Sequence, residues 1–404
     1  MIVSRGIIYN KLSDDLTNII KSFYCDLNDK NLVNKFENKF KYFNQSRYCL
    51  SYPFARSALW SILASSSLKE NDEIILPAIQ IKGMVEVCKF LKLKPVVVDI
   101  DQHNLSFNLK DLKKKITKKT KVILLTYLYG VVPDIGKILK IISKKKIILI
   151  EDFSQCLFGK YKNKLVGNFG DYGIYSLSAT KTLDTYGGGL LVTNKKNNFL
   201  RNLSIRQENF KNYSRIFLIK KILLSLIRNF FILKINFFFV INIFKIFNLL
   251  GIESYKRFVG TRNNKLLKKS PKTWFQVYTS LQAVHGIKYI NFVKRHNEIR
   301  VKNVEKLKRK IGKKYFCKKN KNSKDVYWQC AFFSNKYKKI QNDLLFKNID
   351  VAQPSITLLP NVLNKKNFKA KSIYEKLILI PCYHSLKKIE LDKIISTIKI
   401  LCQK

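Results

Sequence analysis

The chain has 404 residues, more than a single hydrophobic core usually contains, so we expect two domains. Hydrophobic residues make up 46% of it, which is ample for a packed protein. The 77 lysines and arginines outnumber the 27 aspartates and glutamates, which gives a formal net charge of +50.

A charge of this size is typical of proteins that bind nucleic acid or an anionic membrane surface. Here the lysines are scattered among abundant Asn, Ile and Phe, a joint bias that an AT-rich genome produces, and no RNA- or DNA-binding motif accompanies them. We therefore discount the charge as a sign of a partner and expect no nucleic acid.

The eight cysteines form no C-x-x-C pair and do not cluster with the four histidines. This pattern favours small buried side chains in a reducing compartment over disulfides or metal ligands. The N-terminal residues also lack the apolar run of a signal peptide. We therefore expect a cytoplasmic protein without a metal site.

The first functional signal is a helix start. Residues 1–45 predict one helix, around residues 14–23, and say little about function. The segment from Phe54 to Trp60 then opens a helix rich in alanine, leucine and serine. Such a start exposes free N–H groups at the positive end of the helix dipole, which suits a phosphate. An ordinary helix N-terminus looks the same, so both interpretations stay open on this segment alone.

A regular alternation of strands and helices follows. Continuous runs of Val, Ile and Leu between helical segments predict a parallel sheet covered on both faces. We expect strands at residues 73–76, 95–99, 122–126 and 147–150, and helices at residues 82–91, 109–116 and 135–142. Cofactors of such sheets bind at the carboxyl ends of the strands. Tyr127 and Tyr129 follow one strand end, where they either line a substrate site or pack.

The segment from residue 147 to residue 194 carries the chemistry. Asp152 stands at the end of a strand, and Lys181 follows a second strand and precedes the glycines at 187–189. Pyridoxal phosphate needs a lysine amine for a Schiff base and a carboxylate that keeps its ring nitrogen protonated. Ser176 and Ser178 lie where hydroxyls can donate to a phosphate. Taken alone, such an Asp is usually a turn former and such a Lys is usually solvated.

The order of these residues resembles that of the DegT/StrS-type nucleotide-sugar aminotransferases, which are fold type I pyridoxal phosphate enzymes. That family has an acid-x-x-Gln after a strand, then Gly-Asp-aromatic-Gly, an aromatic-Ser, a Lys and a glycine-rich turn. The matching residues here are Asp152, Gln155, Gly170-Asp171-Tyr172-Gly173, Tyr175-Ser176, Lys181 and Gly187-Gly188-Gly189. A looser resemblance covers most of residues 45–205 and resumes at Thr273.

The resemblance implies an α/β chain with the fold type I architecture and a homodimer. We expect a mostly parallel seven-stranded sheet in a large cofactor-binding domain, residues 1–205, which includes an N-terminal segment, residues 1–45. An apolar, basic helical insert follows at residues 206–272, and a smaller α+β domain at residues 273–404.

The resemblance also implies a role for each matching residue. Lys181 would hold pyridoxal phosphate and move the proton, Asp152 would keep the ring nitrogen protonated, and Gln155 would lie by the ring hydroxyl. Ser176 would bind the cofactor phosphate, together with the turn Arg56-Ser57.

The implied reaction moves an amino group to a nucleotide-linked keto sugar, for surface polysaccharide, lipopolysaccharide or glycoconjugate biosynthesis. Glutamate is the usual amino donor of the family. Two alternatives stay open. The chain is a sugar dehydratase of the same family, although those have a histidine in place of Lys181, or it is a cofactor-binding scaffold or regulator that has lost catalysis.

Two positions depart from the family pattern. Where the family often has an aromatic residue that stacks on the cofactor ring, this chain has Ile81. Where the family has an Asn-x-Arg that reaches the cofactor phosphate of the partner subunit, this chain has Phe275-Gln276-Val277, and Gln276 is the candidate substitute. His384 lies in a Pro-Cys-Tyr-His loop and either touches substrate or is a surface residue.

Within the insert, residues 216–250 are strongly apolar and contain scattered basic residues. No uncharged run in it reaches the ~20 residues that span a bilayer. So many Phe, Ile and Leu side chains must nevertheless be covered. They lie in a membrane surface, as a peripheral contact at the inner face of the cytoplasmic membrane, in an oligomer interface, or against the body of the enzyme.

Overall fold

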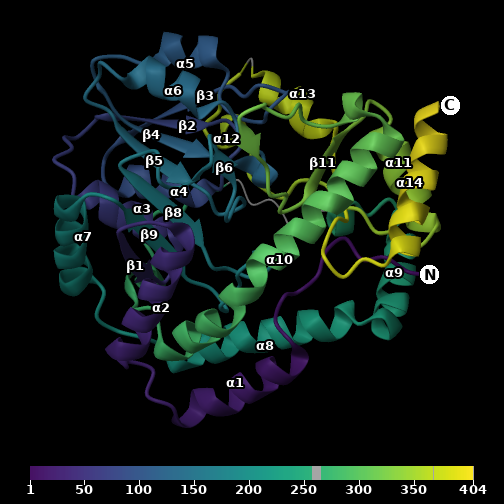
Figure 1. Cartoon of the computed structure of the whole chain (residues 1–404), viewed down its shortest axis with the longest axis horizontal. Helices are drawn as coiled ribbons and strands as arrows, with labels where there is room; N and C mark the ends of the chain where they lie inside the picture. Colours follow the sequence, from purple (N-terminus) through teal and green to yellow (C-terminus); the bar gives the residue numbers. More distant parts are fainter. Residues whose placement is uncertain (257–264, 367, 404) are drawn as a thin grey trace.

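The computed structural model describes residues 1–256, 265–366 and 368–403. Its centre is a seven-stranded sheet with the strand order β1-β9-β8-β5-β4-β2-β3 (Figure 1). The strands are β1 (Tyr48–Tyr52), β2 (Glu73–Pro77), β3 (Lys94–Val98), β4 (Thr120–Thr126), β5 (Ile148–Asp152), β8 (Tyr172–Ser176) and β9 (Gly189–Thr193). β9 is antiparallel to both of its neighbours, whereas the other pairs are parallel. The prediction of a mostly parallel seven-stranded sheet is confirmed.

Helices cover both faces of this sheet, as the apolar strands predicted (Figure 1). Alternate residues of one strand enter different cores, so Leu124 packs with α3 and α4 while Ile123 packs with α2, α5 and α6. The helices in the first half of the chain are α1 (Leu12–Tyr24), α2 (Lys30–Asn44), α3 (Ala55–Ala64), α4 (Lys82–Phe90), α5 (Leu109–Lys115), α6 (Ile135–Ile142) and α7 (Lys196–Asn209).

The C-terminal part begins with α10 (Ser280–Ile311), which crosses the molecule diagonally in Figure 1. Beyond it, β11 (Cys330–Phe333) and β12 (Leu377–Ile380) form an antiparallel pair. Packed around them are α11 (Tyr337–Phe346), α12 (Leu359–Val362), α13 (Lys369–Glu375) and α14 (Lys388–Gln403). A small sheet joins β6 (Lys160–Tyr161) and β7 (Lys164–Leu165) to β10 (Ser323–Lys324). The domain boundaries at residues 205 and 273 stay our proposal.

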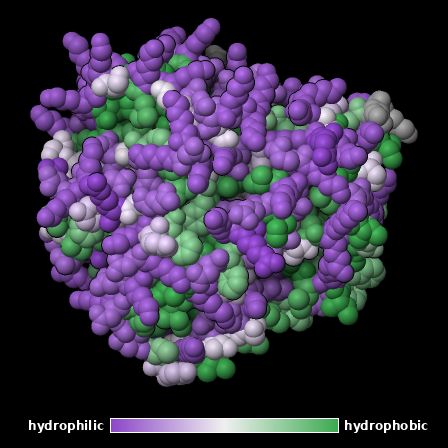
Figure 2. All heavy atoms as spheres, in the orientation of Figure 1, coloured by the Kyte–Doolittle hydropathy of each residue, from purple (hydrophilic) through white to green (hydrophobic). Residues whose placement is uncertain are grey.

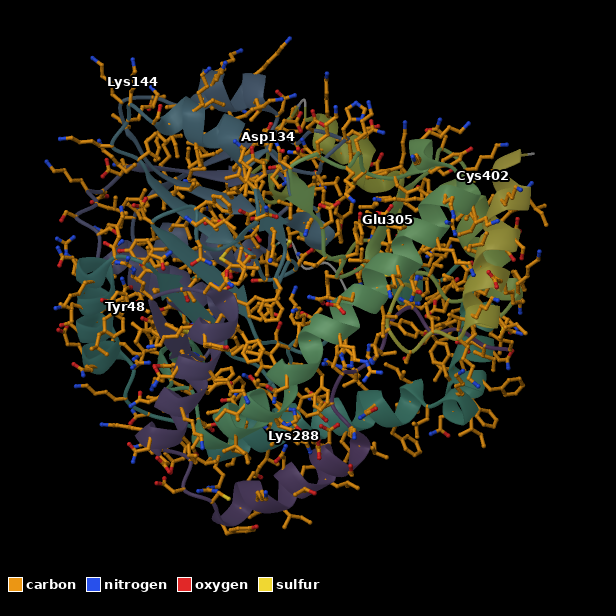
Figure 3. All side chains as sticks on the ribbon, viewed as in Figure 1. Tyr48, Asp134, Lys144, Lys288, Glu305 and Cys402 are labelled. Atoms are coloured by element: carbon orange, nitrogen blue, oxygen red, sulfur yellow. The ribbon has the colours of Figure 1, made fainter. Side chains whose placement is uncertain are left out.

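The N-terminal segment fastens distant parts of the chain together. Val3 pairs with Ile349 of the C-terminal part. Farther along, Asp14 of α1 forms an ion pair with Lys288 of α10, whose Nζ lies 2.7 Å from Oδ1. Figure 3 labels Lys288.

The insert forms two helices, α8 (Arg215–Ile232) and α9 (Lys234–Leu249), and its residues 257–264 lie outside the described residues. No single described helix is long and apolar enough to cross a membrane, whereas α8 and α9 pass that test as a pair bent by 85°. Large apolar side chains of both helices are exposed, and Figure 2 shows hydrophobic atoms along the lower right edge, where Figure 1 places α9.

Candidate active site

Lys181 lies in the tight loop that joins the antiparallel strands β8 and β9. The carboxylate of Asp184 organises this loop, because it accepts hydrogen bonds from the backbone N–H groups of Thr180 (3.2 Å) and Tyr186 (2.8 Å). Burial raises the pKa of Asp184 to about 7. The indole of Trp328 fixes the loop from the C-terminal part by donating to the carbonyl of Thr180, at 2.8 Å. These hydrogen bonds fix the backbone of the loop on both sides of Lys181.

The amine of Lys181 lies above the indole of Trp328, with Nζ 4.0 Å from the ring centroid. Burial lowers the pKa of Lys181 to about 8, and the nearby negative charge of Asp152 opposes this shift only in part. About a tenth of the amine is therefore unprotonated at pH 7, far more than for a solvated lysine, and this neutral form is a nucleophile and a base.

Asp152 is the last residue of β5 and is buried. Its Oδ1 accepts from the backbone N–H of Ser154 at 3.1 Å, and its Oδ2 accepts from Nε2 of Gln80 at 3.2 Å. The same amide nitrogen of Gln80 donates to Oγ1 of Thr126, at 2.6 Å. The orientation of the acid is therefore fixed by Thr126, which ends the adjacent strand β4, and by Gln80, which follows β2 on the other side of β4.

Gln155 is buried, and its Oε1 accepts from the backbone N–H of Tyr129 at 2.6 Å. The ring of Tyr129 stacks on Trp328 with 6.4 Å between centroids, and the hydroxyl of Tyr127 donates to the buried Glu151. Both tyrosines are fully buried. Of the two interpretations of Tyr127 and Tyr129, the structure favours packing.

The start of α3 approaches the glycine run and Ser176. Ser176 pairs with Gly189 across β8 and β9, and a Cβ on Gly189 would lie 2.2 Å from the backbone nitrogen of Ala55. Only glycine permits this approach. Ser176 Oγ lies 2.9 Å from Ser178 Oγ. The first N–H groups of α3 and the hydroxyl of Ser176 therefore occupy one region.

The side chains of Arg56 and Ser57 contact other parts of the chain and are not directed at a phosphate site. Ser57 Oγ donates to the carbonyl of Trp274 at 2.7 Å. The guanidinium of Arg56 lies against the rings of Phe54 and Trp274, with Cζ 4.6 Å and 5.1 Å from the two centroids. Burial lowers the pKa of Arg56. What this turn offers a phosphate is backbone N–H and positive charge.

A cavity of about 800 Å³ opens beside Lys181. Gln155 and Ile81 line it near the lysine, so an aliphatic side chain stands where the family often has an aromatic one. Apolar side chains of α8 and α9, such as Phe231 of α8, also line it, as do Arg5 and Asp350, which form an ion pair with each other.

Three further residues singled out in the sequence, Phe275, Gln276 and His384, are not among the lining residues of this cavity. Phe275 packs against Trp60, with 4.9 Å between ring centroids. Gln276 lines a different cavity, of about 700 Å³, that shares no lining residue with the first. His384 stacks on His296, with 3.5 Å between ring centroids, and is not among the residues that line the cavity at Lys181.

Sequence reasoning missed four side chains near the site. Gln80 and Trp328 touch Asp152 and Lys181, respectively, and two basic residues of α8 approach from the insert. Gln80 had a detectable signal, because it lies just past the end of a predicted strand. Trp328 and the insert residues Lys221 and Arg228 are brought to the site only by tertiary packing.

Curated relatives are similar to parts of the chain. A GDP-perosamine synthase from Escherichia coli O157:H7 is 35% identical over 166 residues, 41% of this chain and 46% of that protein. A GDP-perosamine synthase from Vibrio cholerae is 27% identical over 162 residues, 40% of this chain and 44% of that protein. The chain thus spans about half the length of the curated relatives it matches.

Solved structures share the fold over nearly the whole chain. A putative sugar aminotransferase from Streptococcus pneumoniae, in its PMP form, has a TM-score of 0.74 at 16% identity and covers 100% of this chain and 99% of that one. The E. coli GDP-4-keto-6-deoxy-D-mannose-3-dehydratase with bound hydrated PLP has a TM-score of 0.73 at 18% identity, covering 99% and 100%. The profile of one family matches residues 10–399. The chain belongs to the DegT/DnrJ/EryC1/StrS aminotransferase family.

Proposed function

We propose that this chain is a pyridoxal-phosphate-dependent aminotransferase that transfers an amino group to a nucleotide-linked keto sugar. The observation that carries the proposal is the amine of Lys181, whose pKa is lowered to about 8, at the wall of a cavity near the acid that ends β5. The family supports aminotransfer, and relatives named GDP-perosamine synthase support a nucleotide sugar as acceptor. Glutamate as donor and a role in surface polysaccharide, such as lipopolysaccharide, rest on the resemblance alone.

The residues of the site fit pyridoxal phosphate. Lys181 offers an amine for its aldehyde, the oriented carboxylate of Asp152 suits its ring nitrogen, and the start of α3 with Ser176 suits its phosphate. When bound, this cofactor supplies an electron sink that stabilises negative charge at the α-carbon of the amino donor.

The chain's own residues then have distinct tasks. Lys181 would remove the proton from the α-carbon of the donor, since part of its amine is unprotonated near neutral pH. Asp152, oriented by the hydrogen bond from Gln80, would keep the ring nitrogen protonated. Trp328 would hold the amine in place, since Nζ lies 4.0 Å from the centroid of its ring. The presence of Lys181 rather than a histidine separates this site from the dehydratase alternative.

Lys181→Ala tests the central assignment. Wild-type protein should be yellow, and borohydride should attach the cofactor irreversibly to Lys181, as read by mass spectrometry of its peptide. The variant should retain no cofactor after reduction and should lose turnover by at least about 10²- to 10⁴-fold, the usual contribution of a general base. The assay supplies glutamate and a panel of nucleotide-linked keto sugars. A variant with normal turnover would exclude the proposed mechanism.

Asp152→Asn tests the role proposed for the carboxylate at the ring nitrogen of pyridoxal phosphate. The amide preserves the shape of the carboxylate and should leave the thermal unfolding midpoint nearly unchanged. Turnover should fall nevertheless, because an unprotonated ring nitrogen makes a poor electron sink. Full activity in this variant would mean that another group protonates the ring.

The pH dependence of cofactor attachment tests the lowered pKa. The neutral amine is the reactive form, so the rate of covalent attachment to apoprotein should rise with pH up to about pH 8 and then level off. A solvated lysine would instead give a rate that keeps rising toward the usual lysine pKa of 10.5. Stopped-flow absorbance measures this rate, and Lys181→Ala provides the blank. A rate that still climbs tenfold per pH unit above about pH 9 would contradict the assignment.

The enzyme is further proposed to be a homodimer. The resemblance supports this, and so does α1, whose side chains Leu16, Ile20, Phe23 and Tyr24 are at least half exposed. Apolar surface of this kind is usually covered by a partner. Sedimentation velocity at the assay concentration should give about twice the chain mass of 47.3 kDa. A fully active species at the mass of one chain would exclude the dimer.

The insert is proposed to touch the inner face of the cytoplasmic membrane. Two basic side chains of α9 bind the body of the protein, since Lys234 Nζ lies 2.5 Å from Glu390 Oε1 and Lys245 Nζ lies 2.6 Å from Asn348 Oδ1. Its outward face is apolar, and the residues at least 45% exposed there are Ile235, Phe238, Phe239, Ile243, Ile246 and Leu249. An outward apolar face on a protein of this charge suits an anionic lipid surface.

Flotation with liposomes that contain anionic lipid tests this contact. Wild-type protein should float with the vesicles, less so at high salt, and the double variant Phe238→Ser and Phe239→Ser should stay at the bottom. Phe237 is buried and is left unchanged. The matched control, Tyr42→Ser on α2 with Ile400→Ser on α14, removes exposed apolar side chains outside the insert and α1 and should float like wild type. If wild-type protein fails to float, the membrane contact is wrong.

A further inference from the structure

Two cationic side chains share one aromatic ring at the start of α3. Lys221 of α8 places Nζ 4.5 Å from the centroid of Phe54, and Arg56 places Cζ 4.6 Å from it. Both side chains are only partly exposed. Within the described residues, neither makes a hydrogen bond or an ion pair; Glu86 and Asp184 attract them only from farther away. Among those residues, this region therefore carries positive charge without a direct anionic partner.

The same region borders the glycine run. A Cβ on Gly187 would lie 2.5 Å from Nζ of Lys221, so the amine rests directly on this glycine. The next glycine, Gly188, pairs with Phe54, and Gly189 joins Ser176 to the first backbone nitrogen of α3. The amine of Lys221, the start of α3 and Ser176 thus approach one short stretch of chain from three sides.

Three sources of positive charge add up here. The first turn of α3 contributes the positive end of its dipole, and Arg56 and Lys221 contribute full charges. Burial and the charge of Arg56 lower the pKa of Lys221 to about 8, which means that its protonated form is destabilised here. A bound dianion would stabilise the protonated form, and backbone and side-chain donors are available to it.

The position of Lys221 is fixed by packing on both sides of it. Leu218 and Ile222 are buried in a cluster with Tyr186 of the lysine loop. One turn later, Ser225 Oγ donates to the buried carboxylate of Asp15, at 3.2 Å. Helix α8 is therefore part of the wall of the site, and its lysine does not sample the surface freely.

We propose that Lys221, supplied by the insert of the same chain, binds the phosphate of pyridoxal phosphate. The inference rests on the proposed function of the site. It gives this chain an internal cation where its family takes a polar contact from the partner subunit, a contact for which Phe275-Gln276-Val277 is poorly suited. Lys221 is a binding residue for the cofactor, and it takes no part in proton transfer.

The test compares two ligands that differ only in the phosphate. Dissociation constants of apoprotein for pyridoxal phosphate and for pyridoxal are measured by absorbance titration. Lys221→Met keeps the apolar stem against Phe54 and Phe217 and removes the charge. It should weaken pyridoxal phosphate about 10- to 100-fold, the usual effect of losing a charged hydrogen bond, and should leave pyridoxal unchanged. Lys221→Arg should restore most of the affinity.

The neighbouring Lys220 is the matched control, because it is exposed and its removal changes the net charge equally. Lys220→Met should bind both ligands as wild type does. Equal loss of both ligands in Lys221→Met would show a merely structural role, and unchanged affinity would exclude the contact. If Gln276→Ala alone weakened pyridoxal phosphate, the phosphate contact would belong to the partner. Failure of borohydride to label Lys181 in wild-type protein would instead overturn the proposed function.

Discussion

A lysine amine held partly out of water is the condition on which the rest of the site depends. Burial pushes the pKa of Lys181 down to about 8, and the attraction of Asp152 keeps it from falling farther. The indole of Trp328 covers the amine with an electron-rich face, which tolerates either protonation state better than a second cation would. Hydrogen bonds of Thr180 with Asp184 and Trp328 fix the loop that carries the lysine, and so they keep the amine in this environment.

The parallel sheet supplies the other half of the site by register. Residues at the carboxyl ends of β2, β4 and β5 meet in one line, where Gln80, Thr126 and Asp152 form a continuous chain of hydrogen bonds. Because the three strands are packed on both faces, this line cannot shift without moving the core. The orientation of the acid is thus a property of the sheet as a whole.

Local patterns predicted the sheet, since buried parallel strands are continuous runs of Val, Ile and Leu. The order of Asp152 and Lys181 along the chain singled them out as site residues, and their roles stay a prediction. Contacts between segments that are distant in the sequence could not be predicted from such patterns. Nothing near Trp328 in sequence shows that its indole covers Lys181, and Lys221 looked like one basic residue of an imperfectly amphipathic helix. The amphipathicity of α8 is imperfect because some of its buried side chains are polar. One of them is Ser225, whose hydroxyl donates to Asp15.

The two roles given to the insert constrain each other. If Lys221 binds the cofactor phosphate, α8 must stay docked, and the burial of Leu218, Ile222 and Ser225 agrees with that. A docked α8, followed by a bend of 85° into α9, cannot enter a bilayer as one straight segment. Any membrane contact is then shallow and made by outward side chains such as Phe239. The proposed cofactor contact and the proposed membrane contact thus involve different helices of the insert, α8 and α9, so removing the outward aromatic side chains of α9 should detach the protein from lipid without weakening the cofactor site.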